Sequence, residues 1–109
     1  MAAAAADGGG GRRPLRVLSV QSHVVTGYVG LRAGTFPLQL LGVEVDALPT
    51  VLFSNHGAYP TVRGPRLGRD EVAALVAALD ANGLLRGRRY SHVLTGTHAR
   101  SLDPAEIYA

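Results

Sequence analysis

The 109-residue sequence contains no cysteine, no tryptophan and no lysine. Without cysteine the chain can hold no disulfide, no thiolate metal site and no cysteine nucleophile. This composition is compatible with a reducing compartment, and we expect a cytoplasmic location. Without lysine there is no P-loop, because that loop needs a lysine to reach the phosphates, and there is no Schiff-base lysine. A Walker-type ATPase site is therefore excluded within this sequence.

Long apolar runs are also missing, so the sequence predicts no membrane span and no membrane partner. Residues 1–11, MAAAAADGGGG, have low complexity and lack the charged start and apolar core of a secretory signal. We expect a disordered leader over residues 1–14 and part of one α/β domain over residues 15–109.

All 11 basic residues are arginine, and the net charge is +3. A basic surface can bind nucleic acid. A GC-rich coding bias is the favoured explanation, because it also accounts for the alanine and glycine runs. The arginines are scattered apart from short clusters at residues 12–13 and 86–89, and no aromatic residues alternate with them to stack bases. We expect no nucleic-acid partner.

The first ordered segment is predicted to be a strand over residues 15–20, which are apolar and rich in β-branched side chains. Residues 22–27 are polar, end in glycine and are predicted to form a loop. A helix is expected from Val29, with Val29, Ala33, Phe36 and Leu40 at helical spacing on one face and Gly42 after its end. Pro37 predicts a kink or a restart within this helix.

The second half of the sequence repeats this alternation. Residues 43–47 predict a strand that Pro49 interrupts and residues 51–53 resume. A long loop over residues 54–68 follows, and residues 70–81 predict a helix that ends at residues 82–83. Residues 92–95 predict another strand. The apolar face of the second helix is expected to consist of Val72, Leu75, Val76 and Leu79.

Strands that alternate with helices predict an α/β fold with a parallel sheet and right-handed crossovers. Ligands of such sheets bind beyond the carboxyl ends of the strands. Three loops begin there, over residues 22–30, 54–59 and 96–100, and each opens with small or polar residues. From the pattern alone, we expect a ligand site at this edge of the sheet.

Four segments are more specific than the pattern. They are residues 16–23 with 27–30 (RVLSVQSH and GYVG), 36–42 (FPLQLLG), 53–56 (FSNH) and 90–96 (YSHVLTG). In this order and spacing, the sequence resembles the N-terminal part of the pyridoxal kinase family, within the ribokinase-like superfamily. The resemblance implies a mostly parallel sheet with flanking helices, truncated after about three strand–helix units.

The resemblance also implies an activity, which is ATP-dependent phosphorylation of the 5′-hydroxyl of pyridoxal, pyridoxine or pyridoxamine. It implies ATP and Mg²⁺ as cofactors of the full-length family, with sites that lie outside this sequence, and it implies a homodimer. The family's Gly-Thr-Gly-Asp motif, whose aspartate is the catalytic base, is expected beyond Ala109. Gly96 and Thr97 only superficially resemble its start, since no Gly-Asp follows, and neither they nor Asp103 receive a catalytic role.

Five residues match positions that contact the vitamer in the family. Ser22 would hydrogen-bond the pyridine ring, although a loop serine commonly caps a backbone group. Val29, Val51 and Phe53 would form apolar walls, or equally serve as core residues. His56 would lie at the pocket edge, where a structural hydrogen bond is the alternative role.

Two positions depart from the family. Residues 55–59 read NHGAY where the family usually has Asn-His-Thr-Gly-Tyr, so Gly57 replaces a threonine whose hydroxyl would contact the vitamer. Thr97 replaces a tyrosine that covers the ring. We therefore expect an incomplete vitamer site, no kinase activity and poor folding for this chain alone. A non-catalytic variant that acts through protein association is the alternative function, and a basic nucleic-acid-binding module is a weaker one.

Overall fold

The computed structural model describes residues 15–86 and 89–96. Its elements are β1 (Arg16–Val24), α1 (Leu31–Leu40), β2 (Glu44–Phe53), α2 (Arg69–Ala81) and β3 (His92–Thr95). The leader expected over residues 1–14 lies outside the described residues. No helix in the described part is long and apolar enough to cross a membrane.

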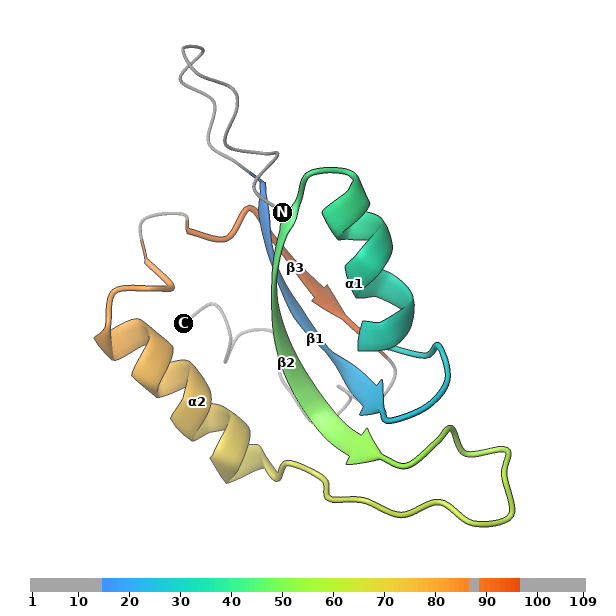
Figure 1. Ribbon diagram of the computed structural model, residues 1–109. Helices are drawn as coiled ribbons and strands as arrows, with labels where there is room; N and C mark the ends of the chain where they lie inside the picture. Colours follow the sequence, from blue (N-terminus) through green and yellow to red (C-terminus); the bar gives the residue numbers. More distant parts are fainter. Residues whose placement is uncertain (1–14, 87–88, 97–109) are drawn as a thin grey trace.

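The three strands form a parallel sheet in the order β2-β1-β3. α1 covers one face of this sheet and α2 lies over the other (Figure 1). The predicted α/β class with a parallel sheet and flanking helices is therefore confirmed. Because β1 is central and covered on both faces, its consecutive residues Val17, Leu18, Ser19 and Val20 are all buried.

β1 is longer than predicted. The strand continues to Val24, so Ser22 and His23 lie on the strand and not in the loop expected over residues 22–27. Backbone pairing explains the extension, since His23 pairs with Leu52 and Val24 with Phe53 of β2. Polar residues at the end of a strand predict a loop from composition alone, although a neighbouring strand can supply partners for their backbone hydrogen bonds.

β2 is one strand, and the predicted interruption at Pro49 is wrong. β2 lies at an edge of the three-stranded sheet, where a proline can be accommodated because no other strand among the described residues pairs with its outer side at Pro49. The register nevertheless shifts just beyond it, as Gln21 pairs with Pro49 but His23 pairs with Leu52. Pro49 therefore marks an irregularity in the ladder and does not divide the strand.

α1 also runs without a restart through Pro37 (Figure 1). The face that Phe36 and Leu40 share does not pack on the sheet: Phe36 is 63% exposed and Leu40 is 70% exposed, whereas Leu31 is buried. The side that faces the sheet carries Gly34, where an added Cβ would meet Gln21 Nε2 at 3.6 Å. α1 has apolar residues on two stripes. The stripe that packs on the sheet is the one on the side of Gly34, where the helix can approach the sheet closely.

α2 and its ends match the sequence closely, since the predicted start and end differ by at most one residue. The Gly68 N–H donates to the Glu71 carboxylate at the N-terminus. At the C-terminus Gly83 N–H bonds Asp80 O and Leu84 N–H bonds Leu79 O, the Schellman pattern. On the predicted apolar face Val72 is buried with Leu18, Val20 and Leu48, but Leu75 is 46% exposed.

Candidate functional site

An open hollow of about 840 Å³ lies where the carboxyl ends of β1 and β2 meet the residue after β3. That size falls within the range of small-molecule sites. All three strand ends contribute to it, as expected of ligand sites on open parallel sheets. Its described lining residues are Gln21, Ser22, Val24, Val29, Gly30, Phe53, His56, Gly57, Val62, Gly64, Arg66 and Gly96.

Four of the five residues singled out from the sequence line this one hollow: Ser22, Val29, Phe53 and His56. They come from three different segments of the chain. Val51 does not line it, because its side chain is buried with 4% of its surface exposed. Residues 97–100 of the third predicted ligand loop, including Thr97, lie outside the described residues.

Ser22 and Gly30 lie against each other at the wall of the hollow. Gly30 precedes α1 with φ 54° and ψ −122°, a conformation that favours glycine. A Cβ at this position would lie 2.5 Å from Ser22 Oγ. Among the described residues, no side chain hydrogen-bonds the Ser22 hydroxyl, which therefore retains its capacity to bond a ligand.

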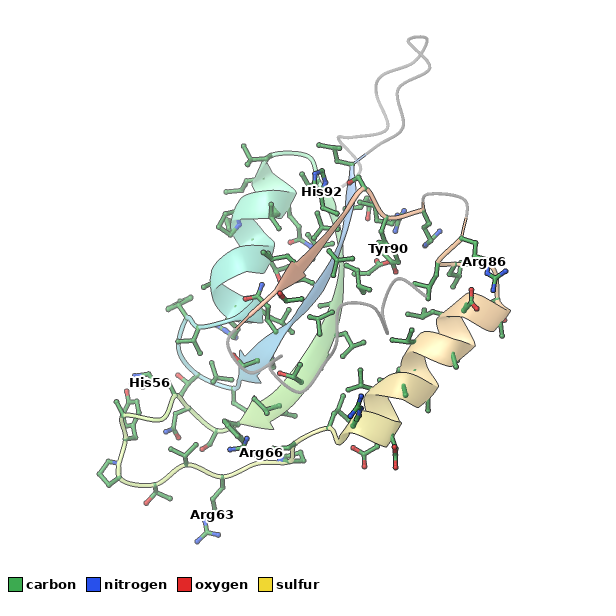
Figure 2. All side chains as sticks on the ribbon, turned by 180° about the vertical axis from the view of Figure 1, so that it is seen from behind. His56, Arg63, Arg66, Arg86, Tyr90 and His92 are labelled. Carbon is green, nitrogen blue, oxygen red and sulfur yellow. The ribbon has the colours of Figure 1, made fainter. Side chains whose placement is uncertain are left out.

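His56 sits on the loop that follows β2 (Figure 2). Its Nδ1 accepts the backbone N–H of Ala58 at 3.1 Å, and its ring lies 4.8 Å from the ring of Tyr59. An accepting Nδ1 places the proton of the neutral imidazole on Nε2. The loop thus fixes a tautomer in which Nε2 is a hydrogen-bond donor.

Ser54 and Asn55 fasten this loop. The Asn55 amide donates to the carbonyl oxygens of His56 at 3.0 Å and of Thr61 at 3.1 Å. Two hydrogen bonds join Ser54 to Arg63. The Ser54 N–H donates to the Arg63 carbonyl oxygen, and the Arg63 N–H donates to Ser54 Oγ. Neither residue was predicted to have a role, although serine and asparagine side chains commonly hydrogen-bond nearby backbone in loops.

Arg66 and Gly64 were also missed. The Arg66 guanidinium lies over the Phe53 ring with its central carbon 5.1 Å from the ring centroid, a cation–π arrangement. Gly64 adopts φ 147°, and a Cβ there would lie 1.8 Å from the Leu52 carbonyl oxygen. A glycine one residue beyond Arg63 and two before Arg66 was the available signal, because it marks close backbone approach.

The described residues do not fit the metal site that the family implies. In residues 15–86 and 89–96, no three histidine, aspartate or glutamate side chains gather to hold a cation. Phosphoryl-transfer enzymes hold Mg²⁺ mainly through carboxylates and phosphate oxygens. No catalytic step through a metal or a nucleotide is therefore derived for these residues.

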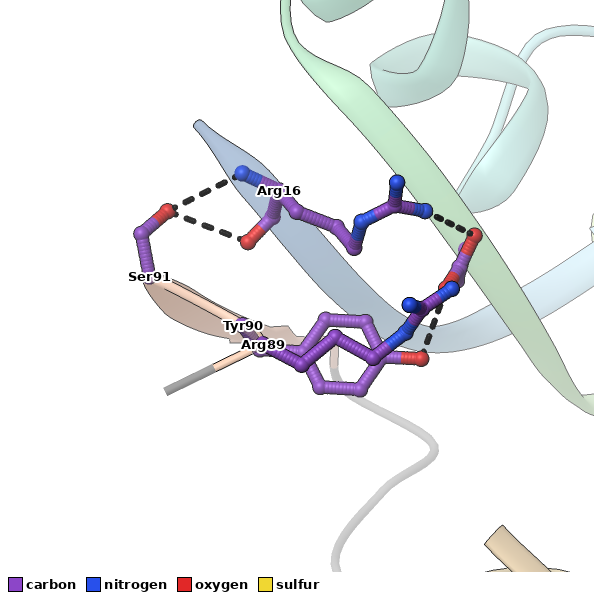
Figure 3. A network of polar contacts seen from close by, with 5 residues as sticks. Arg16, Arg89, Tyr90 and Ser91 are labelled. Carbon is purple, nitrogen blue, oxygen red and sulfur yellow. Dashed lines mark hydrogen bonds and ion pairs between the residues drawn. The ribbon is translucent and has the colours of Figure 1, made fainter. Parts of the chain in front are cut away.

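A second polar cluster lies at the opposite, amino-terminal end of the sheet (Figure 3). The Tyr90 hydroxyl donates to Asp46 Oδ2 at 2.7 Å, and Arg16 and Arg89 lie 3.5 Å and 4.0 Å from the same carboxylate. Partial burial and then the bond to Asp46 raise the pKa of Tyr90 above its usual value of 10.0, which Arg89 opposes. Because these polar groups are paired with one another, we interpret the cluster as a structural link between β1, β2 and the segment before β3.

No family profile matches the chain. Individual proteins do match it. The chain is 54% identical over 88 residues to a pyridoxal kinase of Sus scrofa, and this match covers 81% of this chain and 26% of that protein. It is 53% identical over 81 residues to a pyridoxal kinase of Arabidopsis thaliana, and this match covers 74% of this chain and 25% of that protein.

Solved structures agree with these relatives. Pyridoxal kinase from Leishmania donovani, in complex with ADP and pyridoxamine, superposes with a TM-score of 0.72 and is 49% identical. The match covers 76% of this chain and 28% of that one. The chain thus spans about a quarter of the length of the relatives it matches.

Proposed function

The chain belongs to the pyridoxal kinase family, and from this premise we propose that its hollow binds the ring of a pyridoxal-type vitamer. Its function is then a part in the ATP-dependent phosphorylation of the vitamer's 5′-hydroxyl. Residues 15–109 correspond in this proposal to the N-terminal portion of the family's α/β domain.

One observation carries the proposal. Ser22, Phe53 and His56 stand at two successive strand ends, and the fold turns all three toward one hollow. A basic nucleic-acid-binding module has no need of this arrangement. Retention of nucleic acid on a filter at two salt concentrations tests that weaker alternative, because phosphate binding falls steeply with salt.

Each of the four lining residues singled out from the sequence has a defined part in the proposed complex. The Ser22 hydroxyl hydrogen-bonds the ring nitrogen or the phenolic oxygen. Phe53 and Val29 supply apolar surface to the ring, and His56 donates from Nε2 at the edge. Val51 takes no direct contact through this hollow, because it lies beneath the surface.

The phosphoryl donor would be ATP with Mg²⁺, and neither is assigned to a described residue. What these residues do is bind and orient the acceptor. Because most catalysis of phosphoryl transfer comes from positioned charges around the phosphate, we expect no turnover by this chain alone. Incubation of the purified 109-residue chain with ATP, Mg²⁺ and pyridoxal tests this. Product formation above the rate without protein would contradict it.

Equilibrium binding tests the site itself. Titration of pyridoxine into the full chain, followed by calorimetry, is expected to give saturable binding. Ser22→Ala should weaken it by about two- to tenfold, the effect of one neutral hydrogen bond. Thr61→Ala is the matched control, since Thr61 is exposed and does not line the hollow. Equal affinity of wild type and Ser22→Ala would remove Ser22 from the site, and no binding by wild type would overturn the proposal.

We further propose that the chain associates with a second copy of itself through the outer face of α1. Phe36, Leu40 and Leu41 are 63%, 70% and 79% exposed there. Large apolar side chains grouped on one surface favour association. Sedimentation of the wild type and of Phe36→Ser with Leu40→Ser tests this, and a wild-type monomer at all concentrations would exclude it.

A further inference from the structure

The charges that face the hollow are unbalanced. Among its described lining residues, Arg66 carries a full positive charge and none is an aspartate or glutamate. His56 is the other titratable group there, and its Nδ1 accepts a backbone hydrogen bond. No carboxylate of the described residues forms an ion pair with Arg66, so nothing among them offsets its charge.

The position of Arg66 is well defined by its backbone. Arg66 forms an antiparallel bridge to Val51, and the bonds on either side join Leu52 N–H to Pro65 O at 3.0 Å and Leu67 N–H to Thr50 O at 2.9 Å. This short segment therefore pairs with the outer edge of β2. The pairing presents the Arg66 side chain at the end of the strand that carries Phe53.

The side chain then lies on Phe53. With its guanidinium carbon 5.1 Å from the ring centroid, Arg66 covers one face of the Phe53 ring, a position in which a cationic ligand group would also be attracted. Arg63 of the same loop points away from the fold, whereas Arg66 points toward the end of β2 (Figure 2). The two arginines form a natural pair for comparison, because only Arg66 lines the hollow.

We infer that Arg66 determines vitamer selectivity by disfavouring a positively charged substituent on the ring. This inference rests on the proposed function. Pyridoxamine and pyridoxine have nearly the same shape, but the aminomethyl group of pyridoxamine carries a positive charge near neutral pH, as primary amines do. Arg66 repels that charge and already covers one of the two aromatic faces that could attract it. Pyridoxine therefore binds more tightly than pyridoxamine.

The test is the ratio of the dissociation constants of pyridoxamine and pyridoxine, measured calorimetrically on the full chain. We expect a ratio of about three to ten at low salt for wild type, from a like-charge interaction near a wet surface. Arg66→Gln should bring it near one. Arg66→Lys, which keeps the charge, and Arg63→Gln, which removes a charge elsewhere on the loop, should both keep the wild-type ratio. Use of a ratio cancels any general loss of affinity.

A measurement on wild type covers the case in which Arg66→Gln fails to fold. Raising the salt concentration to about 0.5 M should lower the wild-type ratio, since salt screens exposed charges. If Arg66→Gln folds and keeps the wild-type ratio, the inference is overturned while vitamer binding stands. If Arg66→Gln does not fold, a wild-type ratio that is unchanged in high salt overturns the inference in the same way. Absence of binding of either vitamer to wild type overturns the proposed function and this inference together.

Discussion

Gly30 lies so close to Ser22 that a Cβ on it would be 2.2 Å from the Ser22 carbonyl oxygen and 2.5 Å from its hydroxyl oxygen. The contact joins the residue before α1 to the end of β1. It requires both the absence of a side chain and a φ of 54°. The placement of the Ser22 hydroxyl at the hollow therefore depends on a neighbour that has no functional group of its own.

Gly30→Ala should accordingly destabilise the chain by about 2 kcal/mol or more, because strain at positive φ and steric overlap add. Urea denaturation followed by circular dichroism measures this. Gly57→Ala is the matched control: nothing lies within 4 Å of its added Cβ, and Gly57 is not among the glycines with positive φ. We expect that control to stay within about 0.5 kcal/mol of wild type. Equal stability of the two variants would contradict the proposed contact.

Gly57→Thr should strengthen vitamer binding. Gly57 lines the hollow at the position where the family usually has threonine, and there is open space around it. A restored hydroxyl is expected to raise the affinity for pyridoxine by about two- to tenfold, the equivalent of one hydrogen bond. Gly57→Val has the same branched shape without the hydroxyl and should give no gain. If valine raises the affinity as much as threonine, the effect comes from the backbone and not from a hydrogen bond.

The sequence predicted the elements better than their faces. β3 was placed at its observed bounds, and α2 within one residue, because glycine and acidic residues mark the ends of that helix. The buried side of α1 could not be chosen from the sequence, since Phe36 and Leu40 form a helical stripe as regular as the one that packs. Only the close approach of Gly34 to Gln21 and of Gly30 to Ser22 distinguishes the two stripes, and these are contacts between distant residues.

The candidate site shows the same limit. Ser22, Phe53 and His56 could be singled out because they belong to motifs, and the rule for parallel sheets brings their strand ends to one edge. Arg66 could not, because it lies 13 residues beyond Phe53 on an irregular loop. The position of Arg66 follows from the pairing of residues 65–67 with β2, and no periodic pattern in the sequence predicts that pairing.

The packing of α2 on the sheet can be tested by a pair of truncations on its predicted apolar face. Val72 is 4% exposed and packs on the core cluster, whereas Leu75 is 46% exposed. Val72→Ala should cost about 1.5–3 kcal/mol of the free energy of unfolding, from lost burial and a cavity. Leu75→Ala should cost less than about 1 kcal/mol, since alanine also favours the helix. A larger loss for Leu75 than for Val72 in urea denaturation would show that Leu75, and not Val72, is the residue of α2 that packs on the sheet.

The link between Tyr90 and Asp46 predicts a specific loss of stability in alkali. Partial burial and the bond to Asp46 raise the pKa of Tyr90 above 10.0 in the folded chain. Below a pH of about 10, the tyrosine is protonated in both the folded and the unfolded state, so its contribution is fully present. As the pH rises from about 10 through the folded pKa, the unfolded state releases the proton first, and the contribution is lost.

Tyr90→Phe should therefore be less stable than wild type by about 1 kcal/mol at pH 7, and this difference should shrink above pH 10. Urea denaturation at pH values between 7 and about 11 measures the difference directly, and the titrations of the other tyrosines cancel in it. Tyr28→Phe is the control, because Tyr28 is 78% exposed and phenylalanine keeps the ring beneath Arg32. A Tyr90→Phe difference that stays constant across the whole range would mean that Tyr90 contributes packing alone, and that its bond to Asp46 does not stabilise the link between β2 and the segment before β3.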